Sequence, residues 1–192
     1  MTYSEYRVRT GFSRLDLLAH ANGTLIEEPH PEMGMLPAPP LLMFDRIVDI
    51  QHRDTRGSMV AEQDVDLGAW YFWCHFRHDP VQPGCLGVDA VWQLLGFYLT
   101  LRGAEGTGRA LGCGRVEFSG QIRPHNRVVR YEVEVKRCSA LSSGAVAIGD
   151  ARVLVDGKPI YTVANAKAGA FRGIRYPDYP QPSENSREGG KQ

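Results

Sequence analysis

The longest apolar segment of the chain lies at its centre and predicts a helix from about Gly84 to Arg102. The segment contains Asp89 and Gln93 but is otherwise strongly apolar. It is shorter than the roughly 20 apolar residues that a membrane-spanning helix needs. A short helix that is apolar on most sides is typical of the buried centre of a globular fold. We therefore expect a core helix and no contact with a membrane.

Several segments alternate between apolar and polar residues, which predicts β-strands. The clearest is Arg127–Lys136, where Val129 and every second residue after it share one face and charged residues share the other. The pair Asp156-Gly157 predicts a tight hairpin turn. In all, about six strands are expected, over residues 41–50, 57–64, 111–122, 127–136, 145–155 and 160–170.

The N-terminal region differs from the rest of the chain. Ser13 predicts the N-cap of a short helix that ends at Asn22-Gly23. Five prolines between residues 29 and 40 predict an extended loop, and the glycines of residues 103–108 exclude regular structure there. We therefore divide the chain into an N-terminal helix and loop, a main domain and a disordered C-terminal tail, over residues 1–35, 36–175 and 176–192.

One long helix and a majority of strands after it favour an α+β fold. The economical arrangement is a curved antiparallel sheet wrapped around the central long apolar helix. A sheet covers only one side of a helix, so we expect a second copy of the chain to cover the other side.

Net charge and cysteine content narrow the possible classes of function and the compartment of the protein. The formal net charge is zero, which gives no indication of nucleic-acid binding. The four cysteines are Cys74, Cys85, Cys113 and Cys138, and none form a C-x-x-C pair. The first residues lack the apolar core of a secretory signal. Free thiols in the cytoplasm are the simplest interpretation, and the spacing argues against a zinc site.

Two polar residues on the central helix are the first candidates for chemistry. Asp89 has no counter-charge among its neighbours, and burial of an unpaired carboxylate is costly. A solvated carboxylate near a helix N-terminus is the alternative interpretation. Gln93 lies four residues later on the same face and can hydrogen-bond the carboxyl group. The pair predicts a polar spot in an apolar pocket.

The segment before the helix holds the other candidates. His75 lies in an aromatic run, where a core histidine with satisfied nitrogens is the alternative to a catalytic one. Gly84 and Cys85 begin the helix, where free N–H groups and the helix dipole favour a developing negative charge. Cys85 lacks a neighbouring base in the sequence and is interpreted as a small buried thiol.

Residues 74–99 closely resemble the bacterial 3-hydroxydecanoyl-acyl carrier protein dehydratase/isomerase family. The resemblance extends over roughly residues 12–172 and rests on these segments: Cys74-His75-Phe76, Asp79-Pro80-Val81, Pro83-Gly84-Cys85-Leu86-Gly87, Asp89-Ala90, Trp92-Gln93-Leu94, Gly96-Phe97-Tyr98-Leu99, Leu36-Pro37-Ala38-Pro39, Leu42-Met43-Phe44-Asp45-Arg46, Gly108-Arg109-Ala110-Leu111-Gly112, Leu154-Val155-Asp156-Gly157, Ile160-Tyr161-Thr162 and Lys167-Ala168-Gly169.

The resemblance implies a hot-dog fold and a homodimer with active sites at the subunit interface. His75 of one subunit would face Asp89 of the other, and the N–H groups of Gly84 and Cys85 would polarise a thioester carbonyl. Gln93 would support Asp89. The implied substrate is carried on the phosphopantetheine of acyl carrier protein, and no metal or other cofactor is implied.

The implied contacts with acyl carrier protein are Lys136, Arg137 and Lys167. The basic residues that the family has beyond Arg137 are replaced here by residues 139–142, Ser-Ala-Leu-Ser, so the docking surface departs from the family pattern.

The implied reaction is dehydration of a (3R)-3-hydroxyacyl thioester to a trans-2-enoyl thioester. His75 would remove the C2 proton, and Asp89, kept protonated by burial, would protonate the leaving hydroxyl. An aspartate at position 89 resembles the bifunctional type, which also isomerises trans-2-decenoyl to cis-3-decenoyl thioester. The alternatives are a dehydratase without isomerase activity, a hot-dog acyl thioesterase and a non-catalytic module that binds acyl carrier protein.

Overall fold

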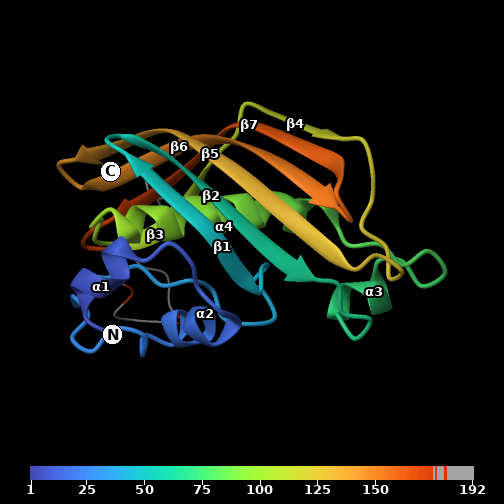
Figure 1. The fold of residues 1–192 in the computed structure, drawn as a ribbon, viewed down its shortest axis with the longest axis horizontal. Helices are drawn as coiled ribbons and strands as arrows, with labels where there is room; N and C mark the ends of the chain where they lie inside the picture. The colour runs from blue at the N-terminus through green and yellow to red at the C-terminus, as the bar shows by residue number, and fades with distance from the viewer. Residues whose placement is uncertain (175, 177–179, 181–192) are drawn as a thin grey trace.

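The computed structural model describes residues 1–174, 176 and 180 of the chain. Apart from residues 176 and 180, the predicted disordered tail lies outside the described residues. Within them, seven strands and four helices form one structure around a single apolar core (Figure 1).

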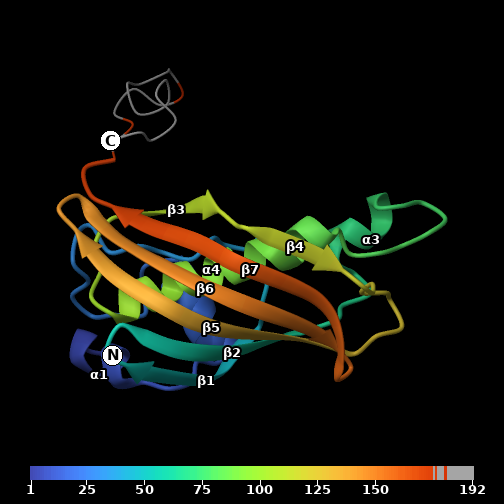
Figure 2. The same ribbon diagram turned by 90° about the horizontal axis from the view of Figure 1, so that it is seen from above.

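A seven-stranded antiparallel sheet forms the larger layer and curves over the longest helix (Figure 2). The strand order is β1-β2-β5-β6-β7-β3, and β4 also pairs with β7. The predicted antiparallel sheet around a central helix is therefore confirmed, with seven strands instead of about six. The strands are β1 (Arg46–Arg53), β2 (Arg56–Asp64), β3 (Thr107–Gly112), β4 (Arg115–Phe118), β5 (Val128–Leu141), β6 (Gly144–Val155) and β7 (Lys158–Phe171).

The clearest alternating segment is confirmed as β5. The side chains of Val129, Tyr131, Val133 and Val135 are all buried, and the residues between them face outward or are partly exposed. The predicted hairpin turn is also present, because residues 156 and 157 join β6 to β7 with positive φ angles of 49° and 81°.

Two strand predictions were wrong in detail. The strand expected from residue 41 begins only at Arg46, because the backbone at Leu41 and Met43 hydrogen-bonds the Gln93 side chain instead of another strand. The single strand expected over residues 111–122 is split into β3 and β4. Its break follows Gly112, whose φ of 125° few other residues adopt. β3 also includes residues 107 and 108, which were expected to be irregular.

The central helix α4 (Gly84–Leu101) is confirmed within one residue of its predicted end. Its length and mean hydropathy of 1.3 are those of a candidate membrane span, but 72% of it is buried inside the fold. Burial against the sheet accounts for its apolar composition, as the sequence indicates.

Three short helices complete the fold: α1 (Tyr3–Val8), α2 (Arg14–Ala21) and α3 (Trp70–Cys74). The predicted helix is α2, and Ser13 and Asp16 form a capping box at its start. Neither α1 nor α3 was predicted. Both span at most six residues, which is too short for a recognisable hydrophobic period.

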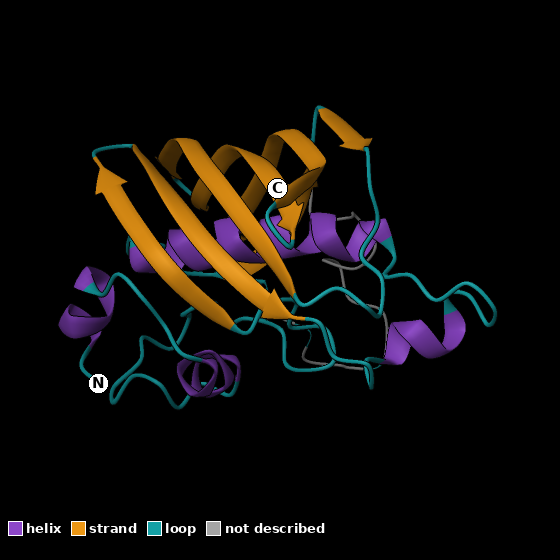
Figure 3. Cartoon of the chain, turned by 45° about the vertical axis from the view of Figure 1, so that its right-hand side comes forward, coloured by secondary structure: helices purple, strands orange, loops and turns teal. Residues whose placement is uncertain are grey.

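The N-terminal region covers part of α4 on the side away from the sheet (Figure 3). Tyr6 of α1 and Phe12 pack their rings on Phe97 of α4. The N-terminal region therefore supplies part of the cover that was expected from a second copy of the chain, and the second copy itself stays a prediction. Past its first residue, α4 keeps one partly exposed line of residues, which we call the open stripe: Cys85, Asp89, Trp92 and Gly96.

A buried chain of hydrogen bonds ties the N-terminal region to α4. Leu36 N–H donates to His20 Nδ1 (3.2 Å), so the ring proton is on Nε2, which faces the Tyr6 hydroxyl at 3.2 Å. Tyr6 lies 2.6 Å from Thr100 Oγ1, which donates to the Phe97 carbonyl oxygen at 2.8 Å. Burial lowers the pKa of His20 to about 4.

The buried His20 predicts a loss of stability in acid. Its pKa is about 4 in the folded chain and about 6.5 in the unfolded chain. The unfolded state therefore binds more protons between these pH values, and the free energy of unfolding should fall by about 3 kcal/mol from pH 7 to pH 4. His20→Asn keeps an acceptor for Leu36 N–H and should remove this part of the pH dependence in thermal melts. His78→Asn, at an exposed loop position, is the control. An unchanged pH dependence in His20→Asn would contradict the assignment.

Candidate functional site

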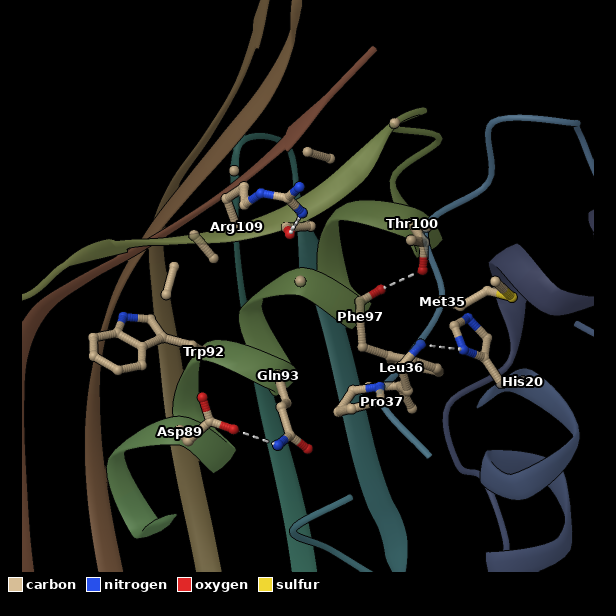
Figure 4. A pocket seen from close by; sticks show the side chains of 18 of the residues that line it. His20, Met35, Leu36, Pro37, Asp89, Trp92, Gln93, Phe97, Thr100 and Arg109 are labelled. Carbon is tan, nitrogen blue, oxygen red and sulfur yellow. Dashed lines mark hydrogen bonds between the residues drawn. The ribbon is translucent and has the colours of Figure 1, made fainter. Parts of the chain in front are cut away.

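A groove of about 210 Å³ runs along α4 beside the open stripe (Figure 4). Along the helix it extends from Asp89 to Thr100, a distance of about 16 Å at the rise of an α-helix. Its other walls are the 34–41 loop, β3 and β7. The lining residues from α4 are Asp89, Trp92, Gln93, Gly96, Phe97 and Thr100. A narrow, largely apolar groove of this length suits an extended alkyl chain.

Asp89 and Gln93 meet at one end of the α4 groove, as predicted (Figure 4). Gln93 Oε1 accepts the N–H of Met43 at 3.1 Å, which fixes the orientation of the amide. Its Nε2 therefore donates both to the Leu41 carbonyl (2.7 Å) and to Asp89 Oδ2 (2.6 Å). The carboxyl group is held through one oxygen, and Oδ1 forms no hydrogen bond within the described residues.

His75 lies outside the groove, in the loop between α3 and α4. Its Nδ1 is 2.9 Å from the carbonyl oxygen of Val81. A carbonyl only accepts, so Nδ1 carries the ring proton and the neutral ring has a free lone pair on Nε2. The ring stacks on Phe76 with centroids 4.0 Å apart. This tautomer is the one that a general base at Nε2 requires.

The N-terminus of α4 lies beside His75. Pro83 is the N-cap, and no side chain caps the helix. The N–H of Leu86 bonds back to the Pro83 carbonyl. In the described part of the chain, the N–H groups of Gly84 and Cys85 have no such partner. They can therefore donate to the carbonyl oxygen of a ligand, and the helix dipole favours negative charge on that oxygen.

His75, Gly84 and Cys85 line a second, more open cavity of about 750 Å³, which we call the His75 cavity. Phe118 and Tyr161 also line it, with their rings edge to face at 4.7 Å. A Cβ at Gly84 would stand 2.6 Å from Phe118, and one at Gly87 would stand 2.7 Å from Tyr161. These glycines are therefore required for the packing of the two rings against α4.

Within one chain, His75 and Asp89 line different cavities. Cys85 belongs to the His75 cavity and lies one helical turn before Asp89 on the open stripe, so the two cavities adjoin along α4. His75 and Asp89 are each half-buried, and Cys85 is exposed. The expectation that Cys85 is a buried thiol is wrong for the single chain, because the open stripe leaves this end of α4 uncovered. Desolvation of His75 and Asp89 stays a prediction, which depends on cover from a second copy of the chain.

The candidate contacts for acyl carrier protein lie on the outer face of the sheet. Lys136 Nζ is 2.8 Å from Asp150 and 2.6 Å from Asn165 Oδ1. Arg137 Nε donates to Ser139 at 2.8 Å. Lys167 is exposed on β7. Of the three, Lys136 is the one held in an ion pair within the described residues, so it is the least available to an acidic partner.

Sequence reasoning missed two residues of the α4 groove, which are Gly96 and His20. Trp92 closes it on one side through a hydrogen bond from Nε1 to the Gly112 carbonyl (3.2 Å). Gly96 leaves space, since a Cβ there would have no atom within 4 Å. His20 lies at the far end (Figure 4). Gly96 shares a helical face with Asp89, Trp92 and Gln93, and this spacing was the signal for it in the sequence.

Comparison with known proteins identifies the family. Among solved structures, the dehydratase heterocomplex ApeI:P from Xenorhabdus doucetiae is similar, with a TM-score of 0.50, 12% identity, and coverage of 79% of this chain and 90% of that chain. A hypothetical thioesterase protein with coenzyme A from Streptococcus pneumoniae TIGR4 has a TM-score of 0.44 and 13% identity, with coverage of 67% and 88%. The first likeness supports the hot-dog fold and says nothing of the reaction.

The model of the FabA-like domain matches residues 36–164, which include α3, α4 and six of the strands in full. The matched segment also contains His75, Asp89 and Gln93. Since it accounts for more than half of the 192 residues, the chain belongs to the FabA-like family and has its hot-dog fold.

Proposed function

We propose that this protein removes water from (3R)-3-hydroxyacyl thioesters carried by acyl carrier protein. The observation that carries the proposal is the open stripe of α4. It places the Asp89 carboxyl between a groove for an alkyl chain and a cavity that holds His75 and free N–H groups. These are the parts that an elimination next to a thioester carbonyl needs.

His75 acts as the base in this proposal. Its Nδ1 proton is used in the bond to Val81, so the lone pair on Nε2 takes the C2 proton of the substrate. That proton becomes acidic when the thioester oxygen accepts N–H bonds from Gly84 and Cys85, because the negative charge of the enolate then lies at the start of α4.

Asp89 acts as the acid. Gln93 holds Oδ2, which leaves Oδ1 to carry a proton toward the C3 hydroxyl. The C3–O bond breaks, water leaves, and the electrons of the C2–H bond form the trans-2 double bond. A proton then returns from His75 to Asp89 through solvent to reset the site. The scheme uses no metal or cofactor apart from the phosphopantetheine that carries the substrate. The absence of any other cofactor stays a prediction.

A second copy of the chain completes the site. His75 and Asp89 line different cavities of one chain, and the open stripe leaves Asp89 partly exposed. A two-fold dimer that covers the stripe would bring His75 of one subunit to Asp89 of the other and exclude water from both. Homodimer formation, contact with acyl carrier protein and a cytoplasmic location remain parts of the proposal.

Isomerisation is the finer part of the proposal. The same His75 and Asp89 would move a proton from C4 to C2 of the trans-2-enoyl product and give the cis-3-enoyl thioester. A thioesterase is the second candidate function, because a half-exposed carboxylate such as Asp89 can also activate water. The two reactions differ in their products, since hydrolysis releases a free thiol.

Purified protein should convert 3-hydroxydecanoyl thioester to trans-2-decenoyl thioester without release of thiol. His75→Ala and Asp89→Asn should each lower the rate by roughly 10²- to 10⁴-fold. Mass analysis of the acyl products and a thiol-trapping assay measure both outcomes, and the cis-3 isomer among the products reports isomerase activity. Thiol release at the rate of substrate loss would instead establish the thioesterase.

Mixing the two inactive variants tests the shared site. If each site takes His75 from one subunit and Asp89 from the other, re-association of His75→Ala with Asp89→Asn should restore roughly a quarter of wild-type activity, because half of the dimers contain one intact site. Each variant alone, refolded in the same way, is the control. No recovery in a sample shown to contain mixed dimers would place both residues of a site in one chain.

Gly96 should set the length of acyl chain that the α4 groove accepts. Gly96→Ala adds a methyl group that meets no protein atom within 4 Å, so it should not destabilise the fold. We expect the rate with the longest accepted substrate to fall roughly 10-fold relative to shorter ones. Gly87→Ala is the matched contrast, because its Cβ meets the buried Tyr161 ring and should cost about 1–3 kcal/mol of stability. An unchanged chain-length profile in Gly96→Ala would place the acyl chain elsewhere.

A further inference from the structure

The N-terminal region encloses a cavity of its own. It has a volume of about 250 Å³ and lies between the end of α2 and the loop that follows, and we call it the N-terminal cavity. Its walls include Leu25, Ile26 and Met33, of which the first two are buried. All of its lining residues precede residue 36, where the match to the FabA-like domain begins. The matched domain alone therefore does not account for this cavity.

The N-terminal cavity adjoins the far end of the α4 groove. His20, Gly34 and Met35 line both spaces, and His20 and Met35 lie at the end of the groove away from Asp89 (Figure 4). The backbone at Gly34 lies close against α4, because a Cβ there would stand 3.2 Å from Thr100 Cγ2. The partition between the groove and the cavity therefore consists of the three shared residues.

Met35 is the part of this partition that a ligand can displace most easily. Its side chain is 64% exposed, and its Sδ lies near Gly23, where an added Cβ would stand 3.3 Å away. The methionine side chain is unbranched, has three rotatable bonds and adapts to different neighbours. We therefore expect Met35 to turn aside for a ligand more easily than the buried ring of His20, which is held by two hydrogen bonds.

The side chains that line the N-terminal cavity offer no free hydrogen-bonding group within the described residues. Apart from two histidines, the lining residues are glycine, proline, methionine, leucine and isoleucine. Both ring nitrogens of His20 belong to the buried chain of hydrogen bonds described above. His30 Nδ1 accepts the N–H of Glu32 at 3.2 Å, and its Nε2 faces Glu105 Oε1 at 3.4 Å. Such a cavity favours an alkyl chain over a polar ligand or ordered water.

The loop that closes the N-terminal cavity is fixed to the rest of the fold. Met33 forms an antiparallel bridge with Glu105, and the N–H of Gly106 donates to the Glu32 carbonyl. Two prolines shortly before this bridge restrict the backbone further. Because the cavity is preformed, a ligand does not lose affinity by ordering this loop.

The length of the α4 groove decides which acyl chains reach the N-terminal cavity. An extended alkyl chain advances by about 1.3 Å per carbon, as follows from C–C bonds of about 1.5 Å. The groove is about 16 Å long and thus holds roughly twelve carbons beyond a C3 atom placed at Asp89. A ten-carbon chain ends within the groove, whereas an eighteen-carbon chain extends about 4 Å past its far end.

We propose that the N-terminal cavity binds the methyl end of acyl chains of about sixteen to eighteen carbons, which pass Met35 from the α4 groove. The placement of the thioester end beside Asp89 rests on the proposed function, and the cavity extends its substrate class to long-chain 3-hydroxyacyl thioesters. Binding of a long acyl chain in the cavity does not itself require any reaction.

The chain carries its own reporters for a binding test. Met33 and Met35 line the N-terminal cavity, whereas Met59 is fully buried in the core and lines neither space. In the full chain labelled with ¹³C at the methionine methyl groups, octadecanoyl pantetheine should shift the Met33 and Met35 signals. Its terminal methyl group should also give a nuclear Overhauser contact with the Met33 methyl group.

Octanoyl pantetheine is the control ligand, because its chain ends within the α4 groove. It should give no contact with Met33, and the Met59 signal should stay in place with either ligand. Octadecanoyl pantetheine that fails to bind, or that binds without contact with Met33, overturns the proposal.

Met33→Trp tests the same cavity by filling it. The ratio of kcat/KM for 3-hydroxyoctadecanoyl thioester to that for 3-hydroxydecanoyl thioester should fall by roughly 10-fold, because the longer chain loses its place in the cavity. Leu15→Trp is the matched control, since it adds the same ring at a residue of α2 that is 78% exposed and lines neither space. Its ratio should equal that of the wild type, and an equal ratio in a folded Met33→Trp protein would contradict the proposal.

The outcomes separate the cavity from the proposed function. Contact between the octadecanoyl chain and Met33 in a protein that dehydrates no 3-hydroxyacyl thioester supports the N-terminal cavity, while the proposed function fails. Dehydration of 3-hydroxydecanoyl thioester without that contact supports the proposed function and overturns the cavity as an acyl site. The binding test uses the wild-type chain, so it decides the matter even where Met33→Trp does not fold.

Discussion

The burial of α4 is the constraint on which the rest of the structure depends. A helix that is apolar on nearly every side has to be covered on nearly every side. The sheet supplies one cover, and the N-terminal region supplies part of the other through Tyr6 and Phe12. What remains is the open stripe, a single line of residues along the helix. The only acidic residue of α4 lies on that line, so the site occupies the place where the fold leaves its core incomplete.

One amide group connects the core helix, the loop beside it and the reactive carboxyl. Gln93 uses its oxygen and both N–H groups, on Met43, Leu41 and Asp89. Because the oxygen and both N–H groups each have a partner, the amide has one stable orientation, and this orientation fixes the position of the Asp89 carboxyl. The same three bonds shape a wall of the α4 groove, since the 34–41 loop is tied to the helix that it faces. The Gln93 amide thus both shapes the groove proposed to bind the acyl chain and positions the Asp89 carboxyl.

Sequence patterns predicted the parts of the fold that depend on local periodicity. The limits of α4, the alternation of β5 and the turn at Asp156-Gly157 follow from residues near one another in the chain. The start of β1 did not, because residues 41 and 43 bond a side chain about fifty positions later. The His20 network was missed for the same reason: the Tyr6–Thr100 contact joins residues 94 positions apart. Family resemblance named His75 and Asp89, but exposure of this end of α4 depends on which faces other segments leave free.

The open stripe has a consequence for the chemistry of sulfur in this protein. Cys85 and Asp89 stand one turn apart on the same face of α4, and the Cys85 thiol is free and exposed in the single chain. Any surface that seals water away from the carboxyl has to pass over the thiol as well. The rate at which a small alkylating reagent modifies Cys85 therefore reports whether this end of α4 is covered or exposed to solvent.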